Sequence, residues 1–532
     1  MKKILFLAIT AVSVMLFQGC QLGDNLDKDP NKPTTVTPDL VLNGICNSIY
    51  MEPWDDVARW CQYNCCNYNY YGNNEYNWAN ASMSFTTIKN VIKMEEEAKR
   101  VGYDAVNPYS ALGKFIRAYQ YYNMTMLVGD LPLSEAFSAT NFTPKYDSQK
   151  EIFIQILKWL EEANDEMTTL LVNGKASFNG DIYFNNDLSA WQKVNNAFAL
   201  RVLISLSSKE SDADLNIKAK FANIFSNPTK YPMLNKNSDG LQYVYNNTFN
   251  KYPVNPDNFG FDATRYNMSA TSLNTFAKLN DPRAMFIAEP CGAKLKAGIQ
   301  PTDFAAFVGA PTNMDLADMS SKAGIDNGAN YLPGEFSFYN RKRYYSTYTA
   351  ENCIQIGYAE MCFNIAEAAN RGWITENAKT WYEKGIVSAQ DFYGIGTGAI
   401  DVYFFKPGGK VTDGGSYNKF TVNFDQSAYL QQSSVSYAGN TATGLGQILT
   451  QKYLAFFQNS GWEGYFNYRR TGLPTFSENG PGIGNSAGGS LIPKRFKYPV
   501  SEVSNNSVNY KAALQSQFGG SDDINASLWV NK

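Results

Sequence analysis

The chain has 532 residues, 18% of them charged and 14% aromatic, with a formal net charge of -3. This length allows a large buried core, and the balanced charge offers nucleic acid no basic surface. Histidine is absent, which excludes Ser-His-Asp triads, Cys-His pairs and HExxH zinc sites. Paired carboxylates remain as a route to catalysis, but no spacing of Asp and Glu marks such a pair. We therefore expect no enzyme, no cofactor and no metal site.

The N-terminus has the features of an export signal. Lys2 and Lys3 precede an apolar run at 4–17, and Gly19 and Cys20 follow it. The run is too short to cross a bilayer comfortably, which favours a signal peptide at 1–19 over a transmembrane helix. Glycine before cysteine resembles a lipoprotein cleavage box, so Cys20 is the expected lipidation site. Ordinary secretion with cleavage nearby is the alternative.

Residues 20–37 are predicted to form a lipidated tether. Proline and threonine are frequent in this stretch, and residues before proline avoid helical geometry. Asp24, Asp27 and Asp29 lie just behind Cys20. This acidic stretch resembles the signal that sends some Gram-negative lipoproteins to the outer cell surface.

Helical periodicity dominates from Pro38 onwards. Apolar residues recur three to four positions apart, which predicts helices. The predicted helical segments are 38–60, 106–128, 148–165, 188–209, 353–373 and 376–394. The last two alternate small alanines with large aromatic residues, as antiparallel helix hairpins of the tetratricopeptide type do, although no strict 34-residue period is visible. The sequence thus predicts an all-α fold whose tetratricopeptide-like helix pairs form a superhelical scaffold.

Two long stretches interrupt this helical pattern. The regions near 210–350 and 395–440 are rich in Asn, Gly, Ser, Tyr and Pro. They are too long for simple connections, so we interpret them as irregular loop insertions that form functional surface or local subdomains. Glycine-rich runs at 394–398 and 480–489 do not join a strand to a helix in the manner of a dinucleotide loop, and turns explain them better.

The segment CQYNCCNYNYYGNNEYNW at 61–78 raises the question of a thiol site. If the preceding helix continues through 57–66, Cys61 and Cys65 share a face and Cys66 points away, so three thiolates do not converge on one metal. Seven cysteines remain after Cys20, an odd number that argues against a complete disulfide framework. We expect most of them to be small buried residues between helices: Cys46, Cys61, Cys65, Cys66, Cys291, Cys353 and Cys362.

A series of collinear motifs resembles the SusD/RagB family. They are LDKDPNKPTTVTPDLVLNG, GDLPLSEAF followed by FTPKYDSQKEIF, NDPRAMF, YAEMCFNIAEAANRGW, YEKGIVSAQDFYG, QKYLAFFQNSGWEGYFNYRRTGLP and IPKRFKYPVSE. Each motif is weak alone, but their order from about residue 20 to about residue 510 covers nearly the whole chain after the signal. The resemblance implies a single helical domain at 38–532.

The resemblance also implies a function. Family members are cell-surface lipoproteins of the outer membrane that sit on a SusC-like TonB-dependent β-barrel transporter and capture oligosaccharides, or in some members oligopeptides, for import. Membrane attachment would be through the N-terminal lipid. A glycan-cleaving enzyme with two carboxylates and a scaffold that binds only its barrel partner are the competing hypotheses.

Charged residues within these motifs have structural explanations. Arg469 and Arg470 have the chemistry to grip a carboxylate ligand, but capping of helix carbonyls or pairing with core acids is the favoured interpretation. Asp281 and Arg283 resemble a turn with a charge-paired arginine.

Candidate ligand contacts are aromatic and amide residues on loops. Neutral sugars stack on rings and hydrogen-bond to amides, and the run NYNYYGNNEYNW offers both. The candidates are Tyr70, Tyr71, Asn73, Asn74 and Trp78, with Tyr245 and Tyr266 from a second tyrosine-rich segment. Glycan sites in the family use a Trp and an Asn after an early helix, and Trp78, Asn73 and Asn74 match by position. Trp78→Ala is therefore expected to weaken ligand binding without unfolding the protein.

Overall fold

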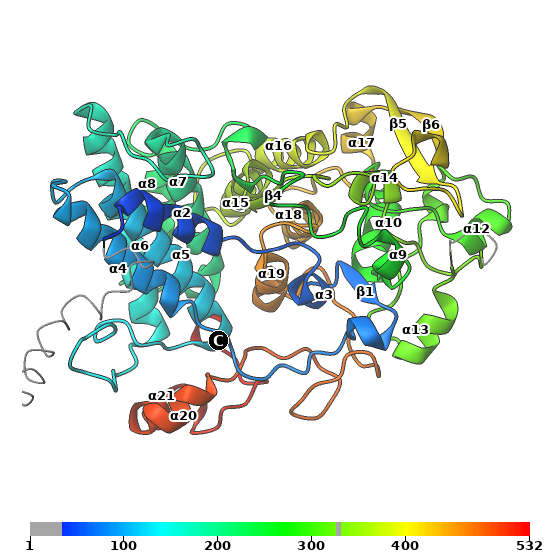
Figure 1. The fold of residues 1–532 in the computed structure, drawn as a ribbon. Coiled ribbons are helices and arrows are strands. Elements are labelled where there is room, and N and C mark those ends of the chain that lie inside the picture. The colour runs from blue at the N-terminus through cyan, green and yellow to red at the C-terminus, as the bar shows by residue number, and fades with distance from the viewer. Residues whose placement is uncertain (1–34, 326–330) are drawn as a thin grey trace, which may run out of the picture.

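The computed structural model describes residues 35–325 and 331–532, and its fold is mostly helical (Figure 1). The predicted signal peptide at 1–19, most of the tether at 20–37 and the expected lipidation site Cys20 lie outside the described residues. Within the described ranges, no helix is both long enough and apolar enough to cross a membrane.

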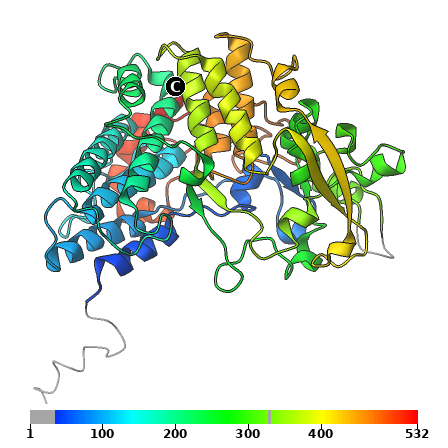
Figure 2. The ribbon, with the colours of Figure 1, turned by 90° about the horizontal axis from the view of Figure 1, so that it is seen from above.

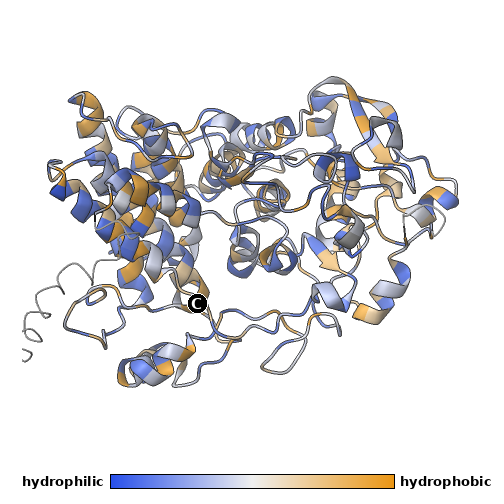
Figure 3. Ribbon diagram, in the orientation of Figure 1, coloured by the Kyte–Doolittle hydropathy of each residue, from blue (hydrophilic) through white to orange (hydrophobic). Residues whose placement is uncertain are grey.

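The first half of the chain forms a layer of antiparallel helices, seen on the left of Figure 1. Its members are α2 (Pro38–Ser48), α4 (Phe85–Arg100), α5 (Pro108–Val128), α6 (Gln149–Val172), α7 (Leu188–Ser205) and α8 (Ile217–Ser226). Neighbours along the chain pack together, as α5 does on α6. Hydrophobic and hydrophilic stretches alternate along these helices (Figure 3), which is the pattern of helices that bury one face.

Local sequence explains where these helices begin. Asn107 and Ser110 form a capping box at the start of α5, in which each side chain accepts a hydrogen bond from the other residue's backbone N–H. Ser148 and Glu151 do the same at the start of α6. Such boxes satisfy donors that the first turn of a helix leaves unpaired.

A second group of helices lies at the centre of the molecule. It contains α15 (Tyr358–Asn370), α16 (Ala378–Asp391), α18 (Ala442–Ala455) and α19 (Glu463–Thr471). The small-large alternation expected for α15 and α16 is present. The small Gly385 of α16 packs against the large Phe363 of α15 so closely that a Cβ at Gly385 would come within 2.7 Å of the Phe363 ring. The predicted fold class, tetratricopeptide-like helix pairs with loop insertions, is confirmed.

Buried ion pairs join α15 to α7 of the first layer and to α19 within the central group. Arg201 of α7 donates to Glu360 of α15, with 2.6 Å between Nε and Oε1. Arg470 of α19 donates to Glu367 of α15 over 2.9 Å. Burial alone would raise the pKa of Glu367, but the charge and hydrogen bonds of Arg470 outweigh it and lower that pKa to about 2. Burial lowers the pKa of the nearby Lys452 to about 8.

The insertions form a region of short elements, seen on the right of Figure 1. Its helices are α9 (Phe259–Asp262), α10 (Thr275–Lys278), α11 (Ala284–Ile287), α12 (Gly292–Lys296), α13 (Leu316–Lys322), α14 (Arg341–Tyr344) and α17 (Gln426–Gln431). Viewed from above, this region and the first helical layer flank the central helices (Figure 2).

There are three antiparallel strand pairs among the described residues, and the first two connect distant parts of the chain. They are β1 (Asn64–Cys66) with β3 (Tyr266–Met268), β2 (Leu241–Tyr243) with β4 (Cys353–Ile356), and β5 (Gly398–Phe405) with β6 (Tyr417–Phe424). Two helix predictions are wrong here. Residues 353–356 form a strand, and α2 ends at Ser48 because Pro53 and the left-handed Trp54 (φ 69°) interrupt it before α3 (Asp56–Trp60).

The C-terminal segment returns to the N-terminal half. It includes α20 (Val500–Asn505) and α21 (Ser507–Phe518). Backbone bridges join Tyr76 to Asn485 and Asn80 to Lys497, so residues 76–80 lie beside a segment from the far end of the chain. One continuous cluster of buried apolar residues extends from Leu42 to Val530.

Candidate functional site

The loop after β1 exposes a group of tyrosine rings. Tyr70 is 82% exposed and Tyr68 is 39% exposed, whereas Tyr71 is half-buried. The ring centroids of Tyr70 and Tyr71 lie 5.2 Å apart, and those of Tyr71 and Tyr266 lie 6.2 Å apart. We call Tyr68, Tyr70, Tyr71 and Tyr266 the tyrosine cluster. It brings together three of the predicted contact residues.

Strand pairing places Tyr266 in this cluster. Cys66 of β1 lies opposite Tyr266 of β3 in the antiparallel register. The neighbouring Arg265 lies over the Tyr68 ring, 4.3 Å from its centroid, and forms no ion pair with any residue that the structure describes. An aromatic surface beside an unpaired guanidinium can stack against a ligand and donate hydrogen bonds to it.

Gly72 lets the loop turn tightly over α3. Its φ of 114° is a conformation that side chains disfavour, and a Cβ there would lie 3.2 Å from Nη2 of Arg59. Asn73 follows in an exposed turn, where its amide donates to Glu75 over 3.1 Å. Asn73 therefore lies next to the tyrosine cluster with its side chain accessible.

Asn74 is not a free ligand contact. Its side chain accepts a hydrogen bond from the backbone N–H of Cys66 over 2.7 Å and donates to the carbonyl of Cys66 over 2.8 Å. Asn74 is buried, and these bonds hold the loop against β1. The prediction that it binds ligand needs correction, because its hydrogen-bonding capacity serves the loop.

Trp78 also needs correction as a predicted ligand platform. Only 1% of its surface is exposed. Its ring stacks on Phe496 with centroids 4.2 Å apart, and Tyr465 contacts it edge-on at 5.0 Å. Trp60 and Trp462 complete this packing. A ring enclosed in this way cannot stack against a sugar. Trp78 instead packs in the core and holds the loop in place.

Tyr245 lies in a different group of rings. It is 5% exposed, packs edge-on against Tyr252 at 5.0 Å and shares a hydrogen bond between hydroxyls with Tyr50. Burial raises the pKa of its hydroxyl well above the ordinary value. No ring contact joins Tyr245 directly to the tyrosine cluster in the described part of the chain, so the structure separates it from Tyr266.

The cysteine predictions have a mixed outcome. The helix expected through 57–66 is wrong, because α3 ends at Trp60 and β1 begins at Asn64. The seven cysteines among the described residues are all buried and free. Burial raises the pKa of the Cys61 and Cys65 thiols, which disfavours reactive thiolates. Within the described residues, no group of three or more Cys, Asp or Glu side chains is placed to hold a metal ion.

The arginines of the sequence motifs have structural roles. Arg470 pairs with the buried Glu367, and Arg469 donates to the carbonyl of Lys494 over 2.9 Å. Arg283 forms two hydrogen bonds with Asp281, of 2.9 and 2.7 Å. The interpretation of these arginines as structural is confirmed.

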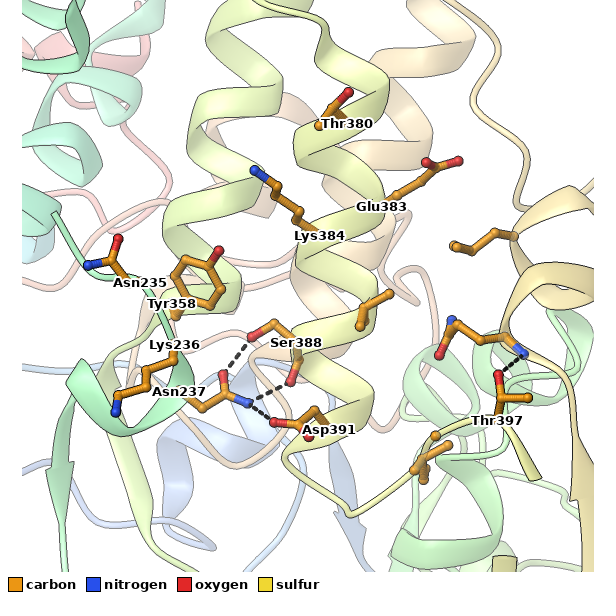
Figure 4. Close-up of a pocket in the computed structure, with 15 residues that line it drawn as sticks. Asn235, Lys236, Asn237, Tyr358, Thr380, Glu383, Lys384, Ser388, Asp391 and Thr397 are labelled. Atoms are coloured by element: carbon orange, nitrogen blue, oxygen red, sulfur yellow. Dashed lines mark hydrogen bonds between the residues drawn. The ribbon is translucent and has the colours of Figure 1, made fainter. Parts of the chain in front are cut away.

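A pocket of about 730 Å³ opens along α16 (Figure 4). Asn237 closes one end by donating to the carbonyl of Ser388 and to the Asp391 carboxylate, over 2.9 and 3.0 Å. Tyr358 is the single aromatic residue among those that line it. With one ring available, this pocket offers less to a stacked ligand than the tyrosine cluster does.

The architecture defines a class: a scaffold of antiparallel helix pairs that carries long loops and an exposed aromatic surface. A family model for SusD-like proteins, described as starch-binding and associating with the outer membrane, matches residues 30–499. The chain belongs to this SusD-like family. No curated protein matches it.

Solved structures share this fold. A SusD homologue from Bacteroides fragilis is 30% identical, with a TM-score of 0.78 and 93% of this chain and 100% of that chain covered. Another SusD homologue from Bacteroides fragilis is 28% identical, with a TM-score of 0.73 and coverage of 94% and 100%. A chitin-binding SusD homologue from Flavobacterium johnsoniae is 20% identical, with a TM-score of 0.68 and coverage of 93% and 98%. This last likeness concerns the fold alone.

Proposed function

We propose that this protein captures oligosaccharides at the cell surface and delivers them to a SusC-like TonB-dependent transporter. The observation that carries the proposal is the tyrosine cluster, in which the Tyr70 ring is 82% exposed and the rings of Tyr68, Tyr71 and Tyr266 are partly exposed. Exposed rings can stack against the C–H faces of sugars, while Arg265 and Asn73 supply hydrogen bonds nearby. Membership of a family described as starch-binding supports this ligand class.

The same proposal includes where the protein lies and how it acts. A lipid on Cys20 anchors the chain to the outer membrane, the residues to 37 act as a tether, and residues 38–532 form one ligand-binding domain. The protein binds without cleaving: ligand is held by stacking and hydrogen bonds and is then enclosed between this domain and the barrel. Oligopeptide capture is the alternative from the same family, and the experiment below separates it.

The test measures binding of maltohexaose, N-acetylchitohexaose and hexaalanine to the full chain in detergent by calorimetry. We expect binding of an oligosaccharide, with affinity at least tenfold lower in the Tyr70→Ala/Tyr71→Ala double variant, because each lost ring contact contributes about 1 kcal/mol. Tyr103→Ala is the matched control, since Tyr103 is an exposed tyrosine outside the cluster.

Two results would contradict the proposal. Binding of hexaalanine alone would favour the oligopeptide alternative. Shortened sugar products after incubation would identify an enzyme instead of a binding protein.

A further inference from the structure

A second cavity lies apart from the tyrosine cluster. It has a volume of about 430 Å³, within the range of small-molecule sites. Its lining residues come from α5, the end of α2, residues 80–84, Trp60 at the end of α3, Trp462 just before α19, and Phe496. We call it the central cavity. None of the residues that line it is charged.

Aromatic rings form one wall of the central cavity. Trp60 and Trp462 stack with centroids 5.6 Å apart and an interplanar angle of 19°, and both remain partly exposed. Phe496 packs edge-on against each of them, at 6.0 and 5.6 Å. These three rings therefore form a rigid apolar surface that keeps an open side, unlike the enclosed ring of Trp78 beneath them.

Amide side chains from α5 also line the central cavity. Gln120 lines the cavity, is only 4% exposed, and its amide has no hydrogen-bond partner among the residues that the structure describes. Asn123 lines it one turn further along, where its Nδ2 donates to the carbonyl of Tyr119 over 3.0 Å and its Oδ1 accepts no described bond. No hydrogen bond to the described residues holds the Gln120 amide, so it can pair with a polar group that enters the cavity.

We propose that the central cavity binds a neutral sugar unit. Stacked tryptophans suit the C–H face of a pyranose ring, and amides suit its hydroxyl groups. The absence of charged lining residues disfavours uronic acids and phosphates, because a buried anion would lack a compensating cation. The tyrosine cluster is a separate, open surface that carries Arg265, so the two sites differ in shape and charge. This inference does not depend on ligand binding at the tyrosine cluster.

The experiment titrates the full chain in detergent with maltose, cellobiose and N,N′-diacetylchitobiose. Tryptophan fluorescence reports on the cavity because Trp60 and Trp462 line it, and calorimetry gives the affinity. We expect at least one disaccharide to bind with a change in fluorescence. Gln120→Leu keeps the approximate volume but removes the amide, so it should weaken this binding at least fivefold without lowering the melting temperature. Gln431→Leu, at an exposed glutamine, is the matched control.

Each result either supports or contradicts sugar binding in the central cavity. The inference is overturned if no disaccharide binds, if Gln120→Leu binds as the wild type does, or if digalacturonate or dialanine binds with the same fluorescence change and the same sensitivity to Gln120→Leu. The Tyr70→Ala/Tyr71→Ala variant separates the two proposals. If only the Tyr70→Ala/Tyr71→Ala variant loses disaccharide binding, the central cavity is rejected as the site and the tyrosine cluster is supported. If only Gln120→Leu loses it, the central cavity is supported and the tyrosine cluster is rejected as the disaccharide site.

Discussion

Tyr70 and Trp78 belong to the same aromatic loop but differ in exposure to solvent. Tyr70 faces solvent, whereas Trp78 is enclosed by Phe496, Tyr465 and other rings. Composition alone indicated that this loop contains the right chemistry for a ligand. It could not show which rings point outward, because two of the rings that cover Trp78, those of Phe496 and Tyr465, come from positions 496 and 465, far later in the chain.

Trp78→Ala is now expected to destabilise the protein. Removing a buried tryptophan leaves a cavity among Trp60, Trp462 and Phe496, at a cost of about 3–5 kcal/mol. Urea denaturation followed by circular dichroism measures this loss. Tyr70→Ala is the control in the same loop, and its denaturation midpoint should stay close to that of the wild type. A stable Trp78→Ala protein that fails only in ligand binding would restore the original prediction.

At the scale of elements, several long helices were predicted, whereas the long helices α4 and α18 and the short elements were not. Residues 108–128 and 188–205 form helices close to their predicted bounds, since apolar periodicity and capping residues act locally. The strand at 353–356 was missed, because its partner β2 lies far away in the sequence. The arginines of the motifs were correctly interpreted as structural. The sequence did not identify Glu367 as the partner of Arg470, nor the Lys494 carbonyl as that of Arg469.

The Glu367 pair is expected to stabilise the contact of α15 with α19. Glu367→Gln leaves Arg470 without its carboxylate, which should cost about 3–5 kcal/mol at pH 7. The pKa of Glu367 is lowered to about 2, so its stabilising contribution is complete above about pH 4.5 and is lost as the pH falls toward 2.

Denaturation midpoints measured between pH 7 and pH 3 check this prediction. The difference between wild type and Glu367→Gln should stay constant from pH 7 to about pH 4.5 and shrink as the pH falls from there toward 3. Glu383→Gln, at a surface ion pair with Lys379, is the control and should change little. A difference that stays constant with pH would show that Glu367 acts by packing alone.

At the scale of the molecule, the collinear motifs predicted the scaffold, and family membership is shown by comparison. The central cavity was not predicted, because its lining residues come from segments near 50, 80, 120, 462 and 496. None of these segments has a distinctive motif by itself. Only folding brings their rings and amides together around one cavity.

The lipid anchor is a testable property of the whole chain. If Cys20 carries acyl chains, the wild type should remain with membranes after a high-salt wash, whereas Cys20→Ser should be released into the soluble fraction. Cys291→Ser serves as a control, because this buried cysteine lies within the folded part. Equal membrane retention of both variants would reject Cys20 as the anchor.

The bridges from Tyr76 to Asn485 and from Asn80 to Lys497 also constrain the order of assembly. If the chain is exported from its N-terminus, as we propose, residues 76–80 emerge long before the residues that cover Trp78. Contacts of such large sequence separation form slowly, because closing a long loop costs entropy before any contact repays it. We would then expect the tyrosine-bearing loop to remain unpacked and accessible to proteases until nearly the whole chain has emerged.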